Sequence, residues 1–508
     1  MVNKILIYFK NLNERQILVI LLSVAFILRL YAVLMAQGIA NDSAVYGFMA
    51  RDFLKGLFAK GLAIPGHPLY PLLISLFSTN TTHVELTGRL VSLFFGTFTL
   101  LPLFYLVKKT IGQKEAIFSA LFYAFHPYLV TYSGMFLTEA TYWGVLLLSV
   151  YFFWTGLQNG NVWKMGLSGL FLGLAYLTRP EGIGYVLVYL VWIVGDSILK
   201  KRWLKAPVLI GALASSIVIL GIPYVIYVHQ ETGRWLISKK AVDAQSELFK
   251  KRVEKIQPSK GMDENKQEKK NSNIRWITRN IVRNLPSVTY HYLRAYHFSF
   301  WLFLFFGLIR IRKKWIPCEL FLASLVLFHL VSLSTFLPST IRFSVPVIPL
   351  SLFWAGAGIL EIKRMMEKIK ISNPERVVLG LILIVILIQL PKSLTPERRH
   401  RAEQEKAGGR LKQNTPADAI IMSNSPQEVF YAERDWVPMP LGIPTSKHPG
   451  RSYKEIIQFG KEKKVGFIFI YKNIQETNPG FLESIHPADL KEIFRKTGQI
   501  SILYEVIY

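Results

Sequence analysis

The sequence predicts an α-helical polytopic membrane protein with about 11 transmembrane helices, followed by a small C-terminal α/β domain outside the cytoplasm. Eleven apolar stretches lie between residues 16 and 391 of the 508-residue chain, which is 51% hydrophobic and has a mean hydropathy of +0.30. Lys and Arg residues gather on alternate connections between these stretches, and the composition changes abruptly after residue 391. These three observations predict a membrane domain at 1–391 and a separate domain at 392–508.

The eleven stretches have the length and composition of membrane-spanning helices. A transmembrane helix needs about 20 mostly apolar residues, and lipid offers the backbone no hydrogen-bond partner, so we expect each stretch to be helical. The first is too long for a cleaved signal peptide and has no small-residue cleavage site behind it, so we expect a retained anchor. The predicted spans are 16–36, 86–107, 115–132, 139–155, 163–178, 182–198, 206–228, 294–309, 318–337, 343–360 and 376–391.

The topology is predicted from the positive charges of the short connections. With the N-terminus in the cytoplasm, six inside segments hold 20 Lys and Arg residues, and the short outside segments hold five. The positive-inside rule expects a bias of this kind. The long outer loop 229–293 is also basic, but it is too long for the rule to apply, and its polar centre predicts a mobile segment. An odd number of spans leaves 392–508 outside the cytoplasm.

The overall charge and the cysteine content exclude several classes of site. The formal net charge is +27. In a membrane protein, Lys and Arg mark cytoplasmic loops and anionic lipid surfaces, so we expect no nucleic-acid partner. Cys318 is the only cysteine, which rules out a disulfide within one chain and a cysteine-based metal site.

Two segments outside the spans have structure of their own. The first outer loop, 37–85, contains apolar residues at near-helical spacing after Asp42, which predicts an amphipathic helix at the membrane surface. In 392–508 the periodicity alternates between helix and strand, which is typical of a small α/β domain. There we expect helices in ERRHRAEQEKAGGRLKQN, RSYKEIIQFGKEKK and HPADLKEIFRKT, and strands in AIIMSN, EVFYAER, VGFIFIY and SILYEVIY.

Two acidic residues on the outer side are candidates for catalysis. Asp42 precedes the predicted helix of the first outer loop, where it either caps that helix or acts as a general base on an acceptor hydroxyl. Glu139 opens the fourth span, where it either interacts with the positive end of the helix dipole or faces an aqueous cavity.

Three arginines on the same side are candidates for binding an anionic group. Arg179 and Arg342 oppose the positive-inside bias, and Arg29 lies about 10 Å below the outer surface if the first span is helical. Arginine offers a planar, always-charged fork to phosphate oxygens, so a lipid-linked phosphate is a suitable shared partner. Alternatively, Arg179 forms a local ion pair with Glu181, and Arg29 reaches the interface through its long side chain.

The histidines of the outer half do not form a metal-binding motif. None of His67, His126, His229, His291 and His297 has an HExxH-like spacing. We therefore assign no metal ligands and no certain cofactor, although a divalent metal held by residues distant in sequence is possible.

Five stretches together resemble the polytopic GT-C glycosyltransferases, and most closely the family-39-like group of protein O-mannosyltransferases and lipid A aminoarabinose transferases. They are NDSAVYGFMARDFLKG, HPLYPLL, MFLTEATYW, LTRPEG and RFSVPVIP, which occur in the expected order over about 390 residues. Two departures are that Ser43, instead of a second acid, follows Asp42, and that His67 replaces the first proline of a common pair.

The resemblance implies a transferase that moves a sugar from a polyprenyl-phosphate donor to an extracytoplasmic lipid, glycan or protein acceptor, with inversion at the anomeric carbon. It places Asp42 and Glu139 at the positions of the family's outer-loop acids. We expect Arg179, Arg342 and Arg29 to bind the donor phosphate. The residues expected to line the substrate cavity are Tyr46, His67, Tyr70 and Glu181.

Other functions remain open at this stage. A lipid-linked glycan ligase, or a transporter or flippase for polyprenyl lipids, would also span the membrane, but transporters tend to show internal repeats, and none is evident in the sequence. A membrane scaffold would leave the outer acids and arginines without a purpose. The expected location is the cell envelope, in a bacterial inner membrane, with the active site and the C-terminal domain on the extracytoplasmic side.

Overall fold

The computed structural model describes residues 12–239, 266–310, 316–336, 340–395, 402–440, 452–471, 474, 480–496 and 501–508. The chain forms two compact units. Unit 1 comprises 1–35, 89–227 and 261–395, and unit 2 comprises 36–88, 228–260 and 396–508.

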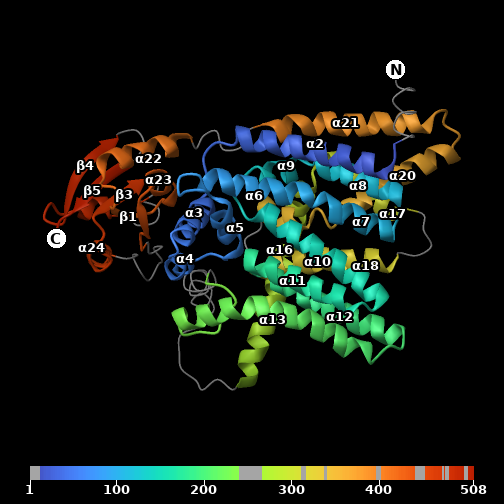
Figure 1. The fold of residues 1–508 in the computed structure, drawn as a ribbon, viewed down its shortest axis with the longest axis horizontal. Helices are drawn as coiled ribbons and strands as arrows, with labels where there is room; N and C mark the ends of the chain where they lie inside the picture. The colour runs from blue at the N-terminus through green and yellow to red at the C-terminus, as the bar shows by residue number, and fades with distance from the viewer. Residues whose placement is uncertain are drawn as a thin grey trace. The chain divides into compact units, whose positions relative to one another are not determined.

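Unit 1 is a helical bundle in which most of the long helices run roughly along one direction (Figure 1). Short helical turns η1 (Pro180–Gly184), η3 (Phe298–Phe300), α19 (Ile341–Ser344) and η4 (Val345–Val347) connect the longer helices. The longer helices are α2 (Glu14–Met35), α6 (Val84–Phe98), α7 (Leu100–Thr110), α8 (Gln113–Phe125), α9 (Pro127–Ser133), α10 (Glu139–Asn159), α11 (Val162–Thr178), α12 (Tyr185–Leu199), α13 (Lys205–Thr232), α16 (Lys266–Tyr296), α17 (Trp301–Ile309), α18 (Pro317–Phe336), α20 (Leu352–Lys368) and α21 (Pro374–Leu394).

Every one of the eleven predicted spans coincides with helix, but not all are single straight helices. Within the described residues, seven helices are long and apolar enough to cross a membrane, and two further spans are helix pairs bent by 80° and 70°. The span predicted at 115–132 is broken between α8 and α9, because Pro127 forces His126 into an extended conformation. The span predicted at 163–178 is α11, which has 17 residues. The count of about 11 therefore includes these two shorter or broken helices.

Helix α10 forms the centre of unit 1. In the most apolar stretch of α10, 83% of the residues are buried, whereas only 28% are buried in the corresponding stretches of α13 and α21. Elsewhere in the bundle, glycines allow helices to approach closely. A Cβ atom on Gly307 of α17 would lie 1.8 Å from the carbonyl oxygen of Trp354 on α20, and one on Gly358 would lie 1.8 Å from that of Phe303. Small residues at such crossings are typical of membrane helices.

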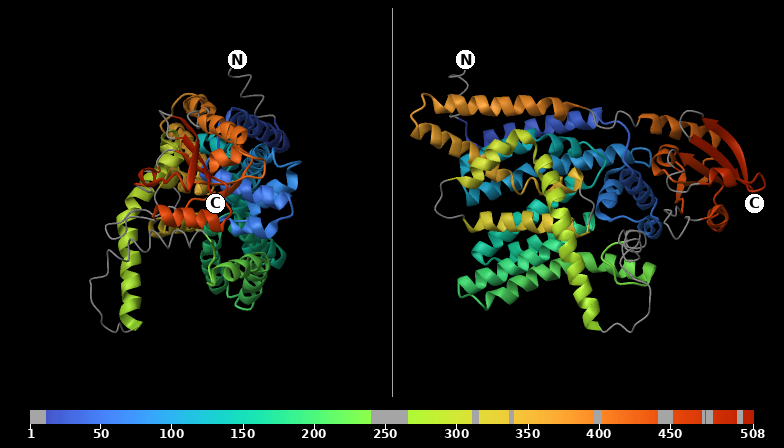
Figure 2. Two further views of the ribbon diagram at one scale, coloured as in Figure 1. Left: turned by 90° about the vertical axis from the view of Figure 1, so that its left-hand side faces the viewer. Right: turned by 180° about the vertical axis from the view of Figure 1, so that it is seen from behind.

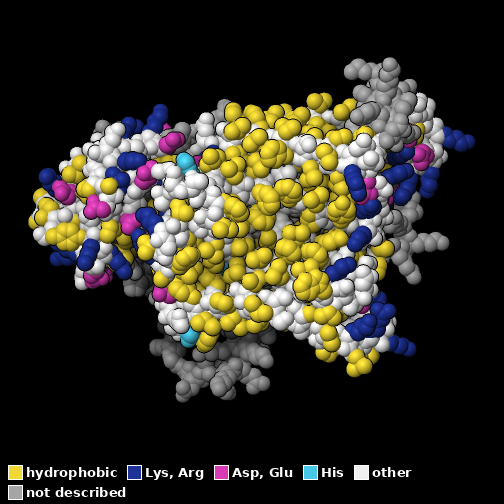
Figure 3. Space-filling model, viewed as in Figure 1, with side chains coloured by type: hydrophobic (Ala, Val, Ile, Leu, Met, Phe, Trp, Pro, Cys, Tyr) yellow, Lys and Arg dark blue, Asp and Glu magenta, His cyan; other side chains and the backbone are white. Residues whose placement is uncertain are grey.

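The outer surface of unit 1 is that of a membrane protein. Large apolar side chains are exposed on several of its helices, among them Ile27, Leu187, Val191, Ile219 and Leu387, each more than 60% exposed. Figure 3 shows this apolar surface as a continuous field over the helices, with Lys and Arg gathered where the helices end. Contiguous apolar surface of this extent needs lipid to cover it, so the chain is an integral membrane protein.

The C-terminal part of unit 2 contains the predicted α/β domain. Its five-stranded mixed sheet has the order β2-β1-β3-β5-β4, in which β1 pairs in parallel with β2 and β3, and β5 pairs antiparallel with β3 and β4. A core that includes Met422, Ile456, Ile468 and Ile502 holds the sheet and helices together. The elements are α22 (Ala402–Asn414), β1 (Ile420–Ser423), α23 (Pro426–Tyr431), β2 (Asp435–Pro438), α24 (Tyr453–Glu462), β3 (Phe467–Tyr471), η6 (Leu482–Ser484), β4 (Leu490–Lys496) and β5 (Ser501–Val506).

Two predictions of local structure in this domain are wrong. The stretch EVFYAER is mostly in helix α23, because Pro426 occupies the first helical turn, where its missing N–H costs nothing. The stretch HPADLKEIFRKT contains strand β4, because pairing with β5 outweighs its helical pattern. The pairing has a register irregularity between Glu492 and Phe494.

The first outer loop packs against this C-terminal domain within unit 2. It forms α3 (Asn41–Leu54), α4 (Phe58–Ala63) and α5 (Leu69–Phe77). Phe48 of α3 stacks on Trp436, with ring centroids 5.5 Å apart. The Arg51 guanidinium lies 3.8 Å from the centroid of the Phe430 ring and donates a hydrogen bond of 3.0 Å to the carbonyl oxygen of Phe430. Helix α3 is therefore mostly buried against protein, whereas the sequence predicted an amphipathic helix at the membrane surface.

Candidate functional site

The candidate site in unit 1 is built around Glu139, the first residue of α10. Its side chain is completely buried. At this position the carboxylate lies at the positive end of the α10 dipole, which stabilises its charge. Burying a carboxylate is nevertheless costly unless charged partners compensate it, and two arginines do so.

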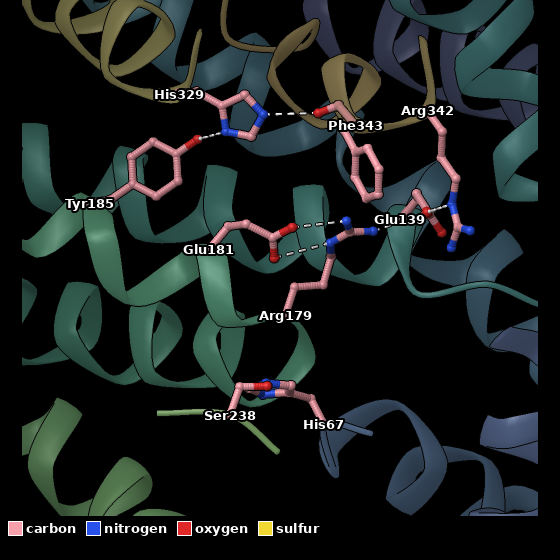
Figure 4. Close-up of polar contacts among 9 residues, drawn as sticks. All are labelled: His67, Glu139, Arg179, Glu181, Tyr185, Ser238, His329, Arg342 and Phe343. Carbon is pink, nitrogen blue, oxygen red and sulfur yellow. Dashed lines mark hydrogen bonds and ion pairs between the residues drawn. The ribbon is translucent and has the colours of Figure 1, made fainter. Parts of the chain in front are cut away.

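Arg179 is the first of these partners and joins two carboxylates. Nη1 donates to Glu139 Oε1 at 2.9 Å, while Nη2 and Nε donate to the two carboxylate oxygens of Glu181 at 3.0 and 3.4 Å. The residue before a proline is disfavoured in the helical region, and Arg179, which precedes Pro180, ends α11 with φ −151° and ψ 138°. This break directs the guanidinium away from the helix and between the two acids, as Figure 4 shows.

Arg342 is the second partner of Glu139. It lies in the short helix α19, and its Nε donates to the same Oε1 atom that accepts from Arg179. The side chain of Arg342 is 23% exposed, whereas that of Arg179 is 9% exposed. We call Glu139, Arg179, Glu181 and Arg342 the charge cluster. Arg342 is its more accessible cation.

The charge cluster is electrically balanced, with two acids and two arginines. Removing one partner of a buried ion pair leaves an uncompensated charge and is strongly destabilising. The aromatic rings of Tyr142 and Phe343 also lie near the Arg179 guanidinium, with centroids 5.7 and 5.5 Å from its Cζ atom. Such rings attract a cation with their negative faces, so Arg179 is held on several sides.

A second hydrogen-bond chain supports the segment that carries Arg342. His329 of α18 joins the Tyr185 hydroxyl at 2.9 Å through Nδ1 and the carbonyl oxygen of Phe343 at 2.9 Å through Nε2 (Figure 4). Nε2 therefore donates, which makes Nδ1 of the neutral ring the acceptor for the tyrosine hydroxyl. Because Phe343 directly follows Arg342, this chain fixes the backbone from which the arginine extends.

The sequence patterns do not predict a functional role for His329, Tyr185 or Phe343. The available signal was His329, an ionisable residue inside the apolar stretch 318–337. Ionisable residues within spans are rare and usually face the protein interior or a cavity. The contact of His329 with a backbone carbonyl has no sequence signal.

Arg29 was predicted to bind the donor phosphate, but its hydrogen bonds go to backbone carbonyl oxygens and not to the residues of the charge cluster. Its side chain is completely buried and donates to the carbonyl oxygens of Ala25, Ala124 and Tyr123 at 3.1, 3.3 and 3.3 Å. Ala124 and Tyr123 lie at the C-terminal end of α8, where backbone carbonyls have no partner in the helix and a cation is favoured. Arg29 therefore ties α2 to the end of α8.

Asp42, the predicted general base, lies in the first turn of α3 in unit 2 and is partly exposed. It is not the N-cap, which is Ala40. The hydroxyl of Ser43 accepts a hydrogen bond of 3.2 Å from the Ala40 N–H. Ser43 thus satisfies the N–H group of the N-cap residue Ala40.

The other predicted cavity residues of unit 2 are buried. Tyr46 and Tyr70 pack edge to face with ring centroids 5.7 Å apart, and the Tyr70 hydroxyl donates to the carbonyl oxygen of Gly88 at 2.8 Å. His67 is 2% exposed, and its Nε2 lies 3.0 Å from the Ser238 hydroxyl. The structure thus groups Tyr46 with Tyr70, pairs His67 with Ser238, and groups Glu139, Arg179, Glu181 and Arg342.

Metal ligands do not gather anywhere in the part of the chain that the structure describes. Within those ranges, no three His, Cys, Asp or Glu residues are close enough together to hold a metal ion. Cys318 is buried at the start of α18.

Known proteins share parts of this chain and its fold. Residues 65–227, which include Glu139, Arg179 and Glu181, match the family described as dolichyl-phosphate-mannose-protein mannosyltransferase. No curated protein sequence matches the chain.

Solved structures match nearly the whole chain at low sequence identity. ArnT from Cupriavidus metallidurans, bound to undecaprenyl phosphate, has a TM-score of 0.62 and 11% identity over 96% of this chain and 97% of its own. Its apo state has a TM-score of 0.61 and 12% identity over the same shares. The oligosaccharyltransferase AglB from Archaeoglobus fulgidus, in complex with an inhibitory peptide and a dolichol-phosphate, has a TM-score of 0.51 and 12% identity over 89% of this chain and 69% of its own.

The similarities to solved structures establish the fold only. Sequence identities this low carry no information about the roles of individual residues. Together with the match at residues 65–227, the similarities confirm three predictions: the polytopic helical fold, the resemblance to GT-C proteins and the enzyme class of glycosyltransferase.

Proposed function

We propose that this chain, a membrane glycosyltransferase of the GT-C type, moves a sugar from a polyprenyl-phosphate donor to an acceptor outside the cytoplasm. The observation that supports this most directly is the charge cluster in the GT-C fold, with its partly exposed arginine. Undecaprenyl phosphate bound to ArnT, which shares this fold, is the chemical precedent for the donor. We propose a lipid, glycan or protein as acceptor.

Within the cluster, we assign the phosphate to Arg342. Arg179 donates to both Glu139 and Glu181 and its side chain is 9% exposed, whereas the side chain of Arg342 is 23% exposed and is therefore the more accessible guanidinium for a ligand. A guanidinium fork binds phosphate oxygens in a defined orientation. Arg179, Glu181 and Glu139 then act as positioning residues that hold Arg342 and balance its charge when no donor is bound.

Asp42 is our candidate for the general base. Glu139 is fully buried, and its carboxylate is enclosed by the two arginines that donate to it. Asp42 is partly exposed and is not the N-cap residue of α3. A base must reach the acceptor proton, and an accessible carboxylate meets this need better than one enclosed by guanidinium groups.

The chemistry balances as a single displacement. Asp42 takes the proton of the acceptor hydroxyl, the acceptor oxygen forms a bond to the anomeric carbon, and the bond from that carbon to the phosphate oxygen breaks. Polyprenyl phosphate leaves with the electron pair, and Arg342 stabilises its charge. Attack from the face opposite the leaving group inverts the configuration of the anomeric carbon.

The proposed location is a bacterial inner membrane, with Glu139, Arg179 and Arg342 on the extracytoplasmic side. The support is the charge bias of the short connections: Lys and Arg gather at the ends of α7, α12 and α20, and the positive-inside rule favours the cytoplasm for such ends. Glu139 opens α10 and Arg179 ends α11, at the opposite ends of helices that follow this pattern.

The test is donor consumption by the purified full-length protein. A panel of polyprenyl-phosphate sugars is incubated with wild type, Asp42→Asn and the matched control Asp418→Asn, an exposed Asp of the C-terminal domain. We expect wild type and Asp418→Asn to release polyprenyl phosphate from at least one donor and Asp42→Asn to be at least about 100-fold slower.

Two results would contradict the proposal. Full activity in Asp42→Asn would remove this residue from the mechanism. Movement of the intact donor across reconstituted vesicles without its consumption by any variant would instead identify a flippase.

A further inference from the structure

Helix α16 carries an unusual run of positive charge in unit 1. After Glu268, the sequence contains no acidic residue until Glu319. Within this stretch Arg275, Arg279 and Arg283 are exposed and follow one another at intervals of four residues. Residues four apart share one face of a helix, so the three arginines form a stripe about 12 Å long at 1.5 Å per residue. We call it the α16 arginine stripe.

The α16 arginine stripe has no compensating acid in the described structure. Within the ranges that the structure covers, no ion pair joins any of the three arginines to a carboxylate, and Arg283 donates only to the amide oxygen of its neighbour Asn284, at 3.3 Å. Like charges at this spacing destabilise a helix. An external anion would remove the repulsion.

The stripe borders a groove with an apolar side chain in it. An open groove of about 570 Å³ is lined by Arg275, Thr278, Arg279, Val282 and Arg283. Val282 is 70% exposed, and Ile277 and Tyr290 on the same helix are 37% and 56% exposed. A helix that exposes apolar and basic side chains together is typical of a lipid–water interface.

The helix is also joined to the membrane part of unit 1. After an 80° bend, α16 continues into α17, an apolar helix that completes a candidate membrane span. Asn284 anchors the middle of α16 to α18 through a hydrogen bond of 2.9 Å to the carbonyl oxygen of Ser334. Figure 2 shows the N-terminal half of α16 standing clear of the other helices of unit 1.

We propose that the α16 arginine stripe binds the phosphate of a lipid headgroup, with part of the lipid's apolar body resting against Val282. Guanidinium groups match phosphate oxygens in charge and geometry, and each basic residue near an anionic lipid surface strengthens the attraction. The apolar contact distinguishes a lipid from a soluble anion. This site shares no residue with the charge cluster and its binding is measured without sugar transfer, so its failure and that of the proposed function are distinguishable.

The experiment measures lipid selectivity of the full-length protein in phosphatidylcholine vesicles. Trace spin-labelled phosphatidic acid and phosphatidylcholine report the share of each lipid immobilised by the protein. The variant Arg275→Gln/Arg279→Gln/Arg283→Gln is compared with Lys454→Gln/Lys463→Gln/Lys496→Gln, which removes the same charge from exposed positions of the C-terminal domain. The variant Arg275→Lys/Arg279→Lys/Arg283→Lys retains the charge.

We expect the triple Gln variant of α16 to lose roughly tenfold or more of the preference for phosphatidic acid. The matched control and the triple Lys variant should keep most of it, and salt should weaken it in wild type. Equal selectivity in wild type and the α16 Gln variant would overturn the proposal, as would an equal loss in the matched control. Complete displacement of the labelled lipid by millimolar inorganic phosphate would show a site for soluble anions and would also overturn it.

Discussion

The buried acid of the charge cluster offers the sharpest test of its energetics. Glu139→Gln keeps the shape of the side chain but removes the charge that balances Arg179 and Arg342. Its Oε1 atom accepts from both arginines, at 2.9 Å from Arg179, in a side chain with no exposure. The variant leaves two cations and one acid, Glu181, in a largely buried setting.

The expected loss of stability follows from these contacts. Removing one partner of a buried ion pair costs about 3–5 kcal/mol of stability. The variant also removes the anion at the positive end of the α10 dipole, which costs a further few tenths of a kcal/mol. Because Gln can still accept one hydrogen bond from each side, we place the cost near the lower end, at about 3 kcal/mol.

The assay is unfolding of the purified protein in detergent, followed by intrinsic fluorescence. The matched control is Glu367→Gln, which breaks the 3.7 Å ion pair with Lys363, in which the Glu367 side chain is 51% exposed. Exposed pairs contribute about 0–1 kcal/mol. The double variant Glu139→Gln/Arg342→Gln restores the charge balance and should recover part of the loss. Equal unfolding of Glu139→Gln and Glu367→Gln would refute this account of the cluster.

Three further predictions concern single residues. His329→Ala removes the contacts to Tyr185 and Phe343, so we expect KM for the donor to rise about tenfold, as for a lost 1–1.5 kcal/mol hydrogen bond, with a smaller change in kcat; exposed His486→Ala serves as control, and an unchanged KM would exclude a positioning role. Arg29→Met should destabilise the protein by about 2–3 kcal/mol and leave donor affinity of the folded protein unchanged, whereas a selective loss of donor affinity would return Arg29 to the phosphate site. Burial raises the pKa of Asp52, and this effect is larger than the lowering of the same pKa by the nearby positive charge of Lys60. A raised pKa in the folded state favours the protonated form, so the stability it contributes is complete below the unfolded pKa and is lost as pH rises through the folded one. Wild type should therefore lose Tm relative to Asp52→Asn as the pH rises above about 4, the ordinary pKa of an Asp side chain, and a constant difference would contradict this assignment.

The membrane spans could be predicted from the sequence because their signal is local. Each span needs a long apolar run, and the composition alone supplies it. Bends in the spans were harder to foresee. The 80° bend lies at His297, which has φ 67°, and no glycine or proline stands at this position to indicate a bend. By contrast, Pro127 does indicate the break between α8 and α9.

The candidate site was partly predictable for a different reason. Arg179 and Arg342 stood out because they oppose the charge bias of the outer side, and both do join Glu139. Arg29 stood out equally by its depth, but its partners are backbone carbonyls of α8, and a helix end presents no side-chain signal. In the C-terminal domain, strand β4 depends on pairing with β5, which the local pattern of Leu490–Lys496 does not contain.

The most direct test of the central claim is binding of undecaprenyl phosphate to Arg342 variants of the full-length protein. Arg342→Gln is compared with wild type and with Arg202→Gln, an exposed arginine at the opposite, Lys-rich ends of the helices. A charge-assisted hydrogen bond contributes about 1.5–3 kcal/mol, so we expect affinity to fall roughly 10- to 100-fold in Arg342→Gln and to stay unchanged in Arg202→Gln. Wild-type affinity in Arg342→Gln would contradict the assignment of the donor phosphate to the charge cluster.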